Sequence, residues 1–394
     1  MQRRTHKQSA VVVGAGAFGG WIALELLRSE FDVTLVDAWG PGNSRASSGG
    51  ETRIIRATYG PSRIYTQMAF DALGLWQENE QRWQCKLFRQ TGAIWMSGSN
   101  DSYERSALPI LREIGVPFEQ LTAAEAAKRW PQIDFSGVPW VIFEPQAGYL
   151  LARRACEVVY EAFLAAGGKY RHARVVPGTV SGKEMKGVLG DDSEELRADV
   201  YIFACGPWLP KMFPSLSQVM RVTRQEVFFF GPAAGDLQYT DMPVWIDNGP
   251  RVFYGIPGNQ WRGFKVADDA RGPEFDPDLA DRRVSSQGLA DTRSYLEMRF
   301  PGMRGAPLLE SRVCQYENSA DDHFIVDRHP EADNAWLVGG GSGHGFKHGP
   351  ALAATVVASV VEKRAPPESF SLKRFLSGTE NKKNAPDGGN RRHW

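Results

Sequence analysis

The stretch that decides the fold reads VVVGAGAFG and spans residues 11–19. Its three β-branched residues predict a short buried strand, and an apolar helix is expected over residues 18–27. Between them lies the pattern G-x-G-x-x-G, which is typical of dinucleotide-binding folds in this strand–turn–helix context. Gly14 permits the tight turn, Gly16 lets the backbone approach a diphosphate, and Gly19 lets the helix pack on the strand. The helix N-terminus is therefore expected to bind phosphate groups.

A carboxylate follows the next expected strand, at residues 33–36. This residue, Asp37, lies 23 positions after Gly14, close to the roughly 20 positions expected of an acid that binds a ribose hydroxyl. The glycines, both strands, the helix and the acid together predict a bound dinucleotide in a Rossmann-like domain. The alternative is a glycine turn in an α/β domain that binds no nucleotide.

Length and composition favour a globular protein of two domains. The chain has 394 residues, 42% of them hydrophobic, and its formal net charge is zero, so charge gives no reason to expect a nucleic-acid partner. No run approaches the roughly 20 apolar residues of a membrane span, and no secretory signal precedes the first strand. The four cysteines are Cys85, Cys156, Cys205 and Cys314. They form no C-x-x-C pair, so neither a metal site nor a disulfide framework is expected, and a cytoplasmic location fits.

The expected elements divide the chain into interleaved parts of an α/β (α+β) fold. Short strands separated by turns between residues 222 and 267 predict an antiparallel sheet. A second strand, glycine-rich loop and helix lies near the C-terminus, over residues 335–362. We expect a discontinuous dinucleotide-binding domain and an interleaved antiparallel-sheet domain that binds the substrate. Their expected ranges are 1–84, 150–220 and 325–378 for the first domain, 85–149 and 221–324 for the second, and 379–394 for a disordered tail.

Several further strings carry the chemistry. The sequence TRIIR at residues 52–56 places Arg53 and Arg56 three positions apart, which predicts that both lie on one side of a helical turn. The other strings are Cys205-Gly206-x-Trp208, Tyr254-Gly255-x-Pro257, Gly263-Phe264-Lys265, Cys314-x-Tyr316 and SGHGFK at residues 342–347. Together with the glycine triplet, these strings resemble the FAD-dependent amine oxidase family of monomeric sarcosine oxidase, N-methyltryptophan oxidase and pipecolate oxidase. The resemblance extends from about residue 11 to about residue 362.

The resemblance implies FAD as the cofactor, attached by a thioether from Cys314 to the flavin 8α-methyl group. The alternative for Cys314 is an inert, buried cysteine. The candidate cofactor-binding residues are Gly14, Gly16, Gly19, Asp37, Ser44, Arg45, Ser47, Ser48, Thr52, Val176, Gly206, Trp208, Cys314, Gly343, Gly345 and Lys347.

The resemblance also implies roles for residues around the flavin. The candidate catalytic residues are Lys265, Arg53, Tyr254 and Tyr316. Lys265 matches a lysine that assists oxygen reduction, since a cation stabilises the developing superoxide charge. Arg53 matches a cation near the ring, and the two tyrosines match residues that line the substrate cavity, with core packing as the alternative. Arg56 and Lys347 match a pair that binds a substrate carboxylate.

Three departures from the family pattern concern the substrate. Gly49 and Asp269 stand where the sarcosine enzymes have histidines, and Glu317 stands in place of a threonine after the cysteine and tyrosine. The missing side chain at Gly49 predicts a wider cavity. Asp269 and Glu317 could face a cationic or hydroxyl-bearing substituent. Gly49 and Asp269 are therefore candidate substrate-binding residues, and a substrate larger than sarcosine is expected.

The function that the resemblance implies is oxidation of the C–N bond of a secondary-amine amino acid to an imine, with O2 reduced to H2O2 by a monomeric enzyme. Two alternatives stay open: a flavin dehydrogenase that uses a quinone or protein acceptor, and a flavin-binding module without turnover. Peroxide yield separates the first two, and bleaching of the flavin by an amine excludes the third.

Overall fold

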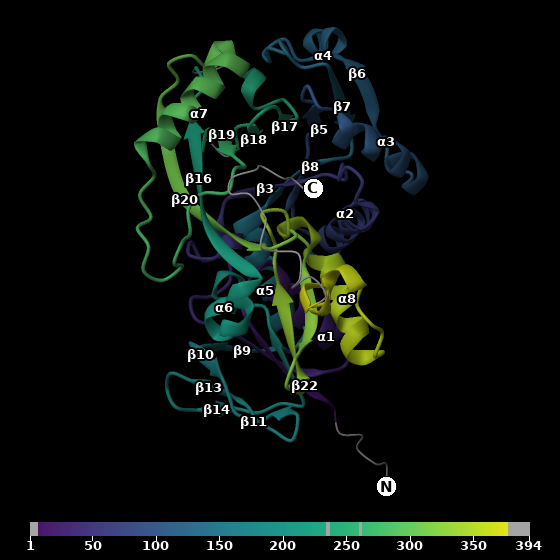
Figure 1. Ribbon diagram of the computed structural model, residues 1–394, viewed down its shortest axis with the longest axis vertical. Coiled ribbons are helices and arrows are strands. Elements are labelled where there is room, and N and C mark those ends of the chain that lie inside the picture. Colours follow the sequence, from purple (N-terminus) through teal and green to yellow (C-terminus); the bar gives the residue numbers. More distant parts are fainter. Residues whose placement is uncertain (1–6, 234–236, 260–261, 377–394) are drawn as a thin grey trace.

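The computed structural model describes residues 7–233, 237–259 and 262–376. Two large sheets organise the chain, one in the lower half of Figure 1 and one in the upper half. The mixture of parallel and antiparallel sheets with helices confirms the α/β (α+β) class. The expected tail at 379–394 lies outside the described residues, and the division into two domains stays a prediction.

The lower sheet contains the strand predicted from the glycine motif at its centre. Its order is β21 (Ile325–His329), β22 (Ala332–Gly339), β15 (Val200–Phe203), β1 (Ser9–Val13), β2 (Asp32–Asp37) and β9 (Lys169–His172). All neighbours are parallel except β21 and β22. Helix α1 (Ala17–Arg28) packs against α5 (Ala152–Ala165) and α8 (Gly349–Val361), and α8 also contacts α2 (Arg63–Trp83). The strand–turn–helix prediction is confirmed.

The upper sheet has eight strands and is antiparallel except where β17 meets β5. Its order is β20 (Leu308–Ser319), β16 (Met220–Phe230), β19 (Phe264–Asp268), β18 (Val252–Ile256), β17 (Val244–Asn248), β5 (Ala93–Met96), β7 (Trp140–Glu144) and β6 (Glu119–Thr122). The predicted antiparallel sheet is confirmed, and strands from before residue 150 extend it. Helix α7 (Ser286–Arg299) contacts β16 and β19.

A third sheet corrects the expectation for the TRIIR string. Residues Thr52–Ile55 form strand β3, which pairs with β8 (Gly148–Leu151), and β8 pairs with β4 (Phe88–Gln90). The predicted helical turn is wrong, because two adjacent isoleucines favour a strand and β8 offers a hydrogen-bonding edge. Arg53 therefore lies within the strand, and Arg56 follows its last residue.

Smaller elements complete the described chain. They are β10 (Val175–Pro177), β11 (Val180–Ser181), β12 (Glu184–Met185), β13 (Val188–Gly190), β14 (Glu195–Leu196), α3 (Ser102–Ile114), α4 (Ala123–Arg129), α6 (Leu209–Met212) and α9 (Lys373–Leu376). Helix α4 begins with the capping box predicted at Thr122 and Glu125, which is confirmed.

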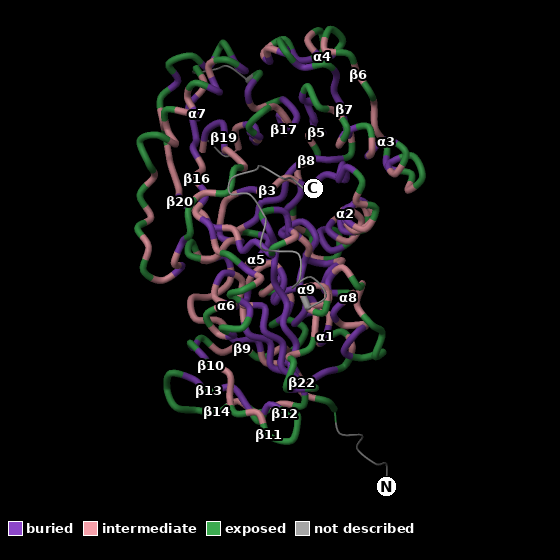
Figure 2. The backbone as a smooth tube through the Cα atoms, viewed as in Figure 1, coloured by how far each residue is buried: buried purple, intermediate pink, exposed green. Residues whose placement is uncertain are grey.

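Burial follows the two large sheets, as the purple tube in Figure 2 shows. Where α1 meets α2, the Trp21 and Trp76 rings lie edge to face with their centroids 5.0 Å apart. In the upper half, Trp245 stacks on Phe264 at 4.6 Å. These aromatic pairs pack α1 against α2 and β17 near β19, and such pairs stabilise both parts of the core. No helix among the described residues has the length and apolar character needed to cross a membrane.

Candidate functional site

The glycine motif forms a close contact between β1, α1 and β15. Gly14 has a φ of +107°, and a Cβ on it would lie 2.3 Å from the carbonyl oxygen of Ala204. A Cβ on Gly19 would lie 1.8 Å from the carbonyl oxygen of Gly14. Neither position can hold a larger residue, because the clashing atoms belong to the backbone. Gly19 therefore packs helix against strand, as predicted, and does not line the pocket.

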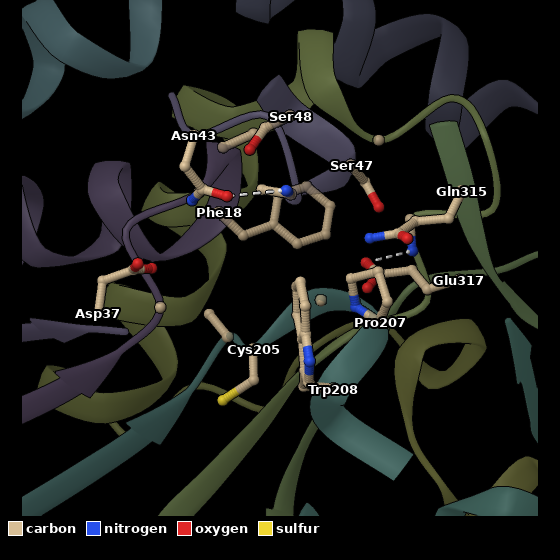
Figure 3. A pocket seen from close by; sticks show the side chains of 18 of the residues that line it. Phe18, Asp37, Asn43, Ser47, Ser48, Cys205, Pro207, Trp208, Gln315 and Glu317 are labelled. Carbon is tan, nitrogen blue, oxygen red and sulfur yellow. Dashed lines mark hydrogen bonds between the residues drawn. The ribbon is translucent and has the colours of Figure 1, made fainter. Parts of the chain in front are cut away.

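A pocket lies at the carboxyl ends of the parallel strands, where ligands of α/β sheets bind. Figure 3 shows Asp37 on one side of it and Glu317 on the other. The Asp37 carboxylate accepts hydrogen bonds from the backbone N–H groups of Ala15 (2.8 Å), Trp39 (2.8 Å) and Gly40 (2.7 Å). These bonds fix the carboxylate at the end of β2, beside the glycine turn.

Two tryptophans and an arginine close the Asp37 side of this pocket. The rings of Trp39 and Trp208 lie 4.6 Å apart, and the Arg174 guanidinium lies 5.0 Å from the centroid of Trp39. Such surfaces stack against planar aromatic groups. Trp39 could have been found from its position two residues after Asp37, but the sequence analysis missed it.

The residues present fit a dinucleotide. The predicted cofactor residues that line this pocket are Gly14, Gly16, Asp37, Ser47, Ser48, Gly206, Trp208, Gly343 and Gly345. Two buried side-chain oxygens of lining residues, Ser47 Oγ and Glu317 Oε2, have no hydrogen-bond partner in the protein. Buried polar atoms without partners in a native protein require an explanation, and a polar ligand in this pocket supplies one.

Other predicted cofactor residues lie elsewhere. Ser44, Cys314 and Lys347 line a second pocket. Arg45 lies over Trp39 at 5.6 Å. The carbonyl oxygen of Thr52 accepts a hydrogen bond from Lys265. Val176 is 53% exposed, whereas Val175 is buried and lines the pocket, because successive strand residues face opposite sides.

The second pocket adjoins the first and has a volume of about 480 Å³. Arg53, Tyr316 and Gly343 line both pockets, so the two form one continuous site. The second pocket brings together the remaining predicted residues Gly49, Arg56, Tyr254, Lys265, Asp269, Cys314 and Lys347. They come from β18, β19, β20, the residue after β19, the short 3-10 helix Ser47–Gly49 before β3, and the loops after β3 and β22, so the upper sheet forms much of the pocket wall.

Lys265 lies on β19 and is only 3% exposed. Its ammonium donates a hydrogen bond of 3.0 Å to the carbonyl oxygen of Thr52. Burial, and then the nearby Arg53 guanidinium, lowers the pKa of Lys265 well below its usual value. A buried cation with one neutral hydrogen-bond partner is ready to interact with negative charge that develops nearby.

Arg56 and Lys347 meet at Tyr59. The Arg56 guanidinium lies 4.3 Å from the centroid of the Tyr59 ring, and the Lys347 ammonium lies 5.3 Å from it. Lys347 also donates hydrogen bonds to the Tyr59 hydroxyl (2.8 Å) and the His344 carbonyl oxygen (2.9 Å). Burial, and then Arg56, lowers the pKa of Lys347 well below its usual value. Two buried cations this close favour binding of an anion between them.

Tyr254, Tyr316 and Asp269 form a hydrogen-bonded group in the same pocket. Tyr316 donates a hydrogen bond of 3.0 Å to Asp269, and the two tyrosine hydroxyls lie 3.4 Å apart. Burial, and then Asp269, raises the pKa of Tyr254 to about 12. Burial also raises the pKa of Tyr316 well above its usual value, so both tyrosines stay protonated near neutral pH, and Tyr254 can donate a hydrogen bond to a ligand.

Arg53 connects the two pockets. Its guanidinium donates hydrogen bonds to the carbonyl oxygens of Thr52 (2.8 Å) and Ser47 (2.6 Å), and lies 3.7 Å from the Cys314 sulfur. Cys314 is half-buried and free. A flavin ring placed between the pockets would therefore meet a thiol and a guanidinium from neighbouring elements.

Two substrate predictions need correction. A Cβ on Gly49 would lie 1.7 Å from the carbonyl oxygen of Asn43, so it points into backbone and not into the pocket. Gly49 is required by loop packing and does not widen the cavity. Glu317 lines the dinucleotide pocket and does not line the second one, because residues alternate sides along β20 and Tyr316 takes the side that faces the substrate residues.

Further residues of the site were missed by the sequence analysis. Tyr59 is fully buried between Arg56 and Lys347. The Glu144 carboxylate accepts hydrogen bonds from the N–H groups of Ala57 (2.7 Å) and Thr58 (2.9 Å), which fixes the backbone after Arg56. Neither Tyr59 nor Glu144 lies in a local sequence pattern that indicates its role. In the described ranges, no group of three His, Cys, Asp or Glu residues is arranged for a metal ion.

Curated proteins of known activity are similar over most of the chain. Monomeric sarcosine oxidase of Bacillus sp. (strain B-0618) is 32% identical over 347 residues, which cover 86% of this chain and 88% of that protein. N-methyl-L-tryptophan oxidase of Yersinia pestis (strain Pestoides F) is 27% identical over 377 residues, which cover 93% and 98%.

Solved structures share the fold. L-proline dehydrogenase from P. horikoshii superposes with a TM-score of 0.81 at 19% identity, over 95% of this chain and 99% of that one. The fructosamine oxidase Amadoriase II from Aspergillus fumigatus gives a TM-score of 0.79 at 20% identity, over 95% and 92%.

A family model described as FAD dependent oxidoreductase matches residues 9–359. The match includes the glycine turn, the two pockets and the helix after the second glycine loop. The chain belongs to the FAD-dependent oxidoreductase family.

Proposed function

We propose that this protein oxidises the C–N bond of an N-substituted or cyclic amino acid to an imine and reduces O2 to H2O2. The observation that carries the proposal is the pair of buried cations, Arg56 and Lys347, in the pocket that adjoins the dinucleotide pocket. A substrate carboxylate neutralises both, because a guanidinium fork and an ammonium together complement a planar anion. The names of the similar curated proteins support the same substrate class.

The cofactor would be held by the glycine turn, Asp37 and the loops around Ser47 and Gly343. Bound FAD would supply the redox chemistry: an acceptor for the hydride equivalent of the C–H bond beside the amine nitrogen, and a source of two electrons for O2. The protein provides orientation and charge. Arg56 and Lys347 anchor the carboxylate, and the carboxylate position then fixes where the C–H bond lies.

Lys265 and the tyrosines act on the other groups of the site. The buried Lys265 ammonium stabilises the negative charge that develops on reduced oxygen. Tyr254 donates a hydrogen bond toward the substrate, Tyr316, whose proton goes to Asp269, can accept one, and both rings exclude water. We propose that Cys314 attaches the flavin covalently. The support is the position of Cys314 in the second pocket, beside Arg53, which lines both pockets.

The substrate is proposed to be larger than sarcosine. Gly49 and Glu317 do not support a larger substrate, but Asp269 does. This residue lines the second pocket and accepts a hydrogen bond from Tyr316. A carboxylate at this position disfavours a second anion and favours an N-substituent with hydroxyl or cationic groups.

The enzyme is further proposed to be monomeric and cytoplasmic. Its four cysteines are free, which fits a reducing compartment, and a similar protein carries the name monomeric sarcosine oxidase. Sedimentation of the holoenzyme at several concentrations tests the monomeric state.

An anaerobic screen tests the activity. N-methyl, cyclic and other N-substituted amino acids are mixed with the holoenzyme, and the visible absorbance of the oxidised flavin is followed before and after air is admitted. Bleaching by an N-substituted amino acid and rapid recovery in air with stoichiometric peroxide support the oxidase. Bleaching with slow recovery favours a dehydrogenase, and no bleaching by any amine contradicts the proposal.

A further inference from the structure

We propose that Glu317 is a cofactor-binding residue whose carboxyl oxygen Oε2 shares a hydrogen bond with a hydroxyl of the FAD ribityl chain. This role is distinct from the proposed substrate chemistry and concerns how this chain holds its dinucleotide.

The glutamate is fixed from the protein side. Glu317 lies on β20, is 7% exposed, and its Oε1 accepts a hydrogen bond of 3.2 Å from the Gly341 N–H. The Ser342 N–H donates to the Glu317 carbonyl oxygen at 3.0 Å. Both contacts tie the residue to the glycine loop after β22, so its carboxyl group has little freedom to turn elsewhere.

The second carboxyl oxygen faces the pocket without a partner. Oε2 is buried and makes no hydrogen bond within the protein. It lies 3.0 Å from the place where a Cβ on Gly206 would stand, so the space beside it exists because residue 206 is a glycine with φ +53°. An unsatisfied buried carboxyl oxygen is costly, and a donor or acceptor from a bound ligand removes that cost.

Position along the pocket identifies the part of the cofactor. Asp37, the ribose-binding acid, lies on the opposite side of the pocket in Figure 3. Cys314 lines the second pocket, beside the proposed place of the flavin ring. It precedes Glu317 by three residues on β20, which corresponds to about 10 Å along a strand. Glu317 is thus between the ends that bind the ring and the adenosine. The ribityl chain joins these parts of FAD and carries the 2′-, 3′- and 4′-hydroxyls.

The protonation behaviour of Glu317 agrees with this placement. Burial raises the pKa of its carboxyl group to about 7, and a nearby diphosphate would raise that pKa further. A neutral carboxyl group can stand near the diphosphate without repulsion. It can accept from Gly341 through one oxygen and share its proton with a hydroxyl through the other.

The test measures FAD binding in a Cys314→Ala background, in which no thioether can form. Full-length apoprotein is titrated with FAD and with 2′-, 3′- and 4′-deoxyribityl FAD, and bound flavin is followed by fluorescence. Glu317→Leu removes both carboxyl oxygens, and Glu317→Gln keeps hydrogen bonding. The matched control is Glu310→Leu, which removes a glutamate on the same strand that pairs with Arg312.

Glu317→Leu is expected to weaken FAD binding about tenfold relative to the control, and Glu317→Gln less than threefold, as for loss of one buried hydrogen bond. The Cys314→Ala protein, which is the parent of the other variants, should bind one deoxy analogue more weakly than it binds FAD. This difference in affinity should vanish when Glu317→Leu is added. Equal FAD affinity of Glu317→Leu and Glu310→Leu overturns the proposal. Equal affinity of the parent for FAD and all three analogues also overturns it, and this measurement needs no Glu317 variant to fold.

Discussion

Lys347 donates a hydrogen bond of 2.8 Å to the hydroxyl of Tyr59. The same tyrosine ring faces the Arg56 guanidinium at 4.3 Å, so a neutral aromatic residue holds two cations close together. Burial lowers the pKa of Lys347, and an anion that enters the pocket would raise that pKa and favour the ammonium form. Tyr59 therefore prepares a carboxylate site in the absence of a carboxylate.

Loss of this pair should abolish carboxylate recognition. The double substitution Arg56→Ala and Lys347→Ala is expected to weaken the binding of small carboxylate inhibitors by at least about 100-fold, because charge-assisted hydrogen bonds each contribute roughly 1.5–3 kcal/mol. Inhibitor titration of the flavin absorbance measures this. Lys186→Ala, which removes an exposed lysine paired with Glu184 away from both pockets, is the control and should change nothing. Retained affinity in the double variant would overturn the assignment.

Lys265 should affect the rate of flavin reoxidation by O2 and have little effect on the rate of flavin reduction by the amine. Lys265→Met is expected to slow flavin reoxidation by a few orders of magnitude, equivalent to roughly 3–5 kcal/mol of lost charge stabilisation, while anaerobic reduction changes much less. Since the pKa of Lys265 is lowered, the wild-type reoxidation rate should fall as the pH rises through that pKa. Stopped-flow measurements of both half-reactions decide it: an equal loss in both would make Lys265 structural.

Covalent attachment can be read from colour. Acid precipitation of the wild type should leave yellow flavin in the pellet, and Cys314→Ala should release it into the supernatant. Cys85→Ala is the control, because Cys85 is a free cysteine that lines neither the dinucleotide pocket nor the second pocket. A colourless wild-type pellet contradicts the thioether.

Gly49 offers a test of stability without chemistry. Gly49→Ala is expected to lower stability by roughly 1–3 kcal/mol, the usual cost of overpacking, because its Cβ would meet the Asn43 carbonyl oxygen. Gly74 lies in helix α2 with no atom within 4 Å of an added Cβ, so Gly74→Ala should stabilise by about 0.5–1 kcal/mol. Thermal melts compare them. A Gly49→Ala protein as stable as Gly74→Ala would restore the wider-cavity interpretation.

Glu317 should make stability depend on pH. Its pKa is raised from 4.5 to about 7 in the folded chain, so the folded state binds more protons than the unfolded state in this window. The free energy of unfolding of the apoprotein should therefore fall from pH 4.5 to 7, by up to about 3 kcal/mol from this group. Urea melts of wild type and Glu317→Gln at pH 5 and 7.5 test this: parallel changes in both proteins would contradict it.

Local patterns were enough for much of the fold. The glycine triplet predicted β1, the turn and α1, because only glycine satisfies the backbone contacts at Gly14 and Gly19. Alternating short strands predicted the antiparallel sheet. The TRIIR string was misassigned because spacing of two arginines also fits a helix, and the pairing with β8 is a long-range contact that spacing does not contain.

The candidate site was predictable where a residue lies in a distinctive sequence string, such as TRIIR or SGHGFK. Lys265, Arg56 and Lys347 converge on one pocket as expected. The direction of a side chain was less predictable: Gly49 and Glu317 were placed by sequence position, whereas the Cβ direction and strand alternation decide what they face. Tyr59 was missed because a buried tyrosine has no local pattern that separates it from the core.

The most direct measurement is anaerobic reduction of the holoenzyme flavin by N-substituted amino acids, with matched amines that lack the carboxylate as controls, followed by admission of air. The structure, with Arg56 and Lys347 in the pocket next to Lys265, predicts bleaching by the amino acids, little bleaching by the decarboxylated amines, and rapid recovery with one peroxide per flavin. Equal bleaching by both sets, or none by either, would contradict the account.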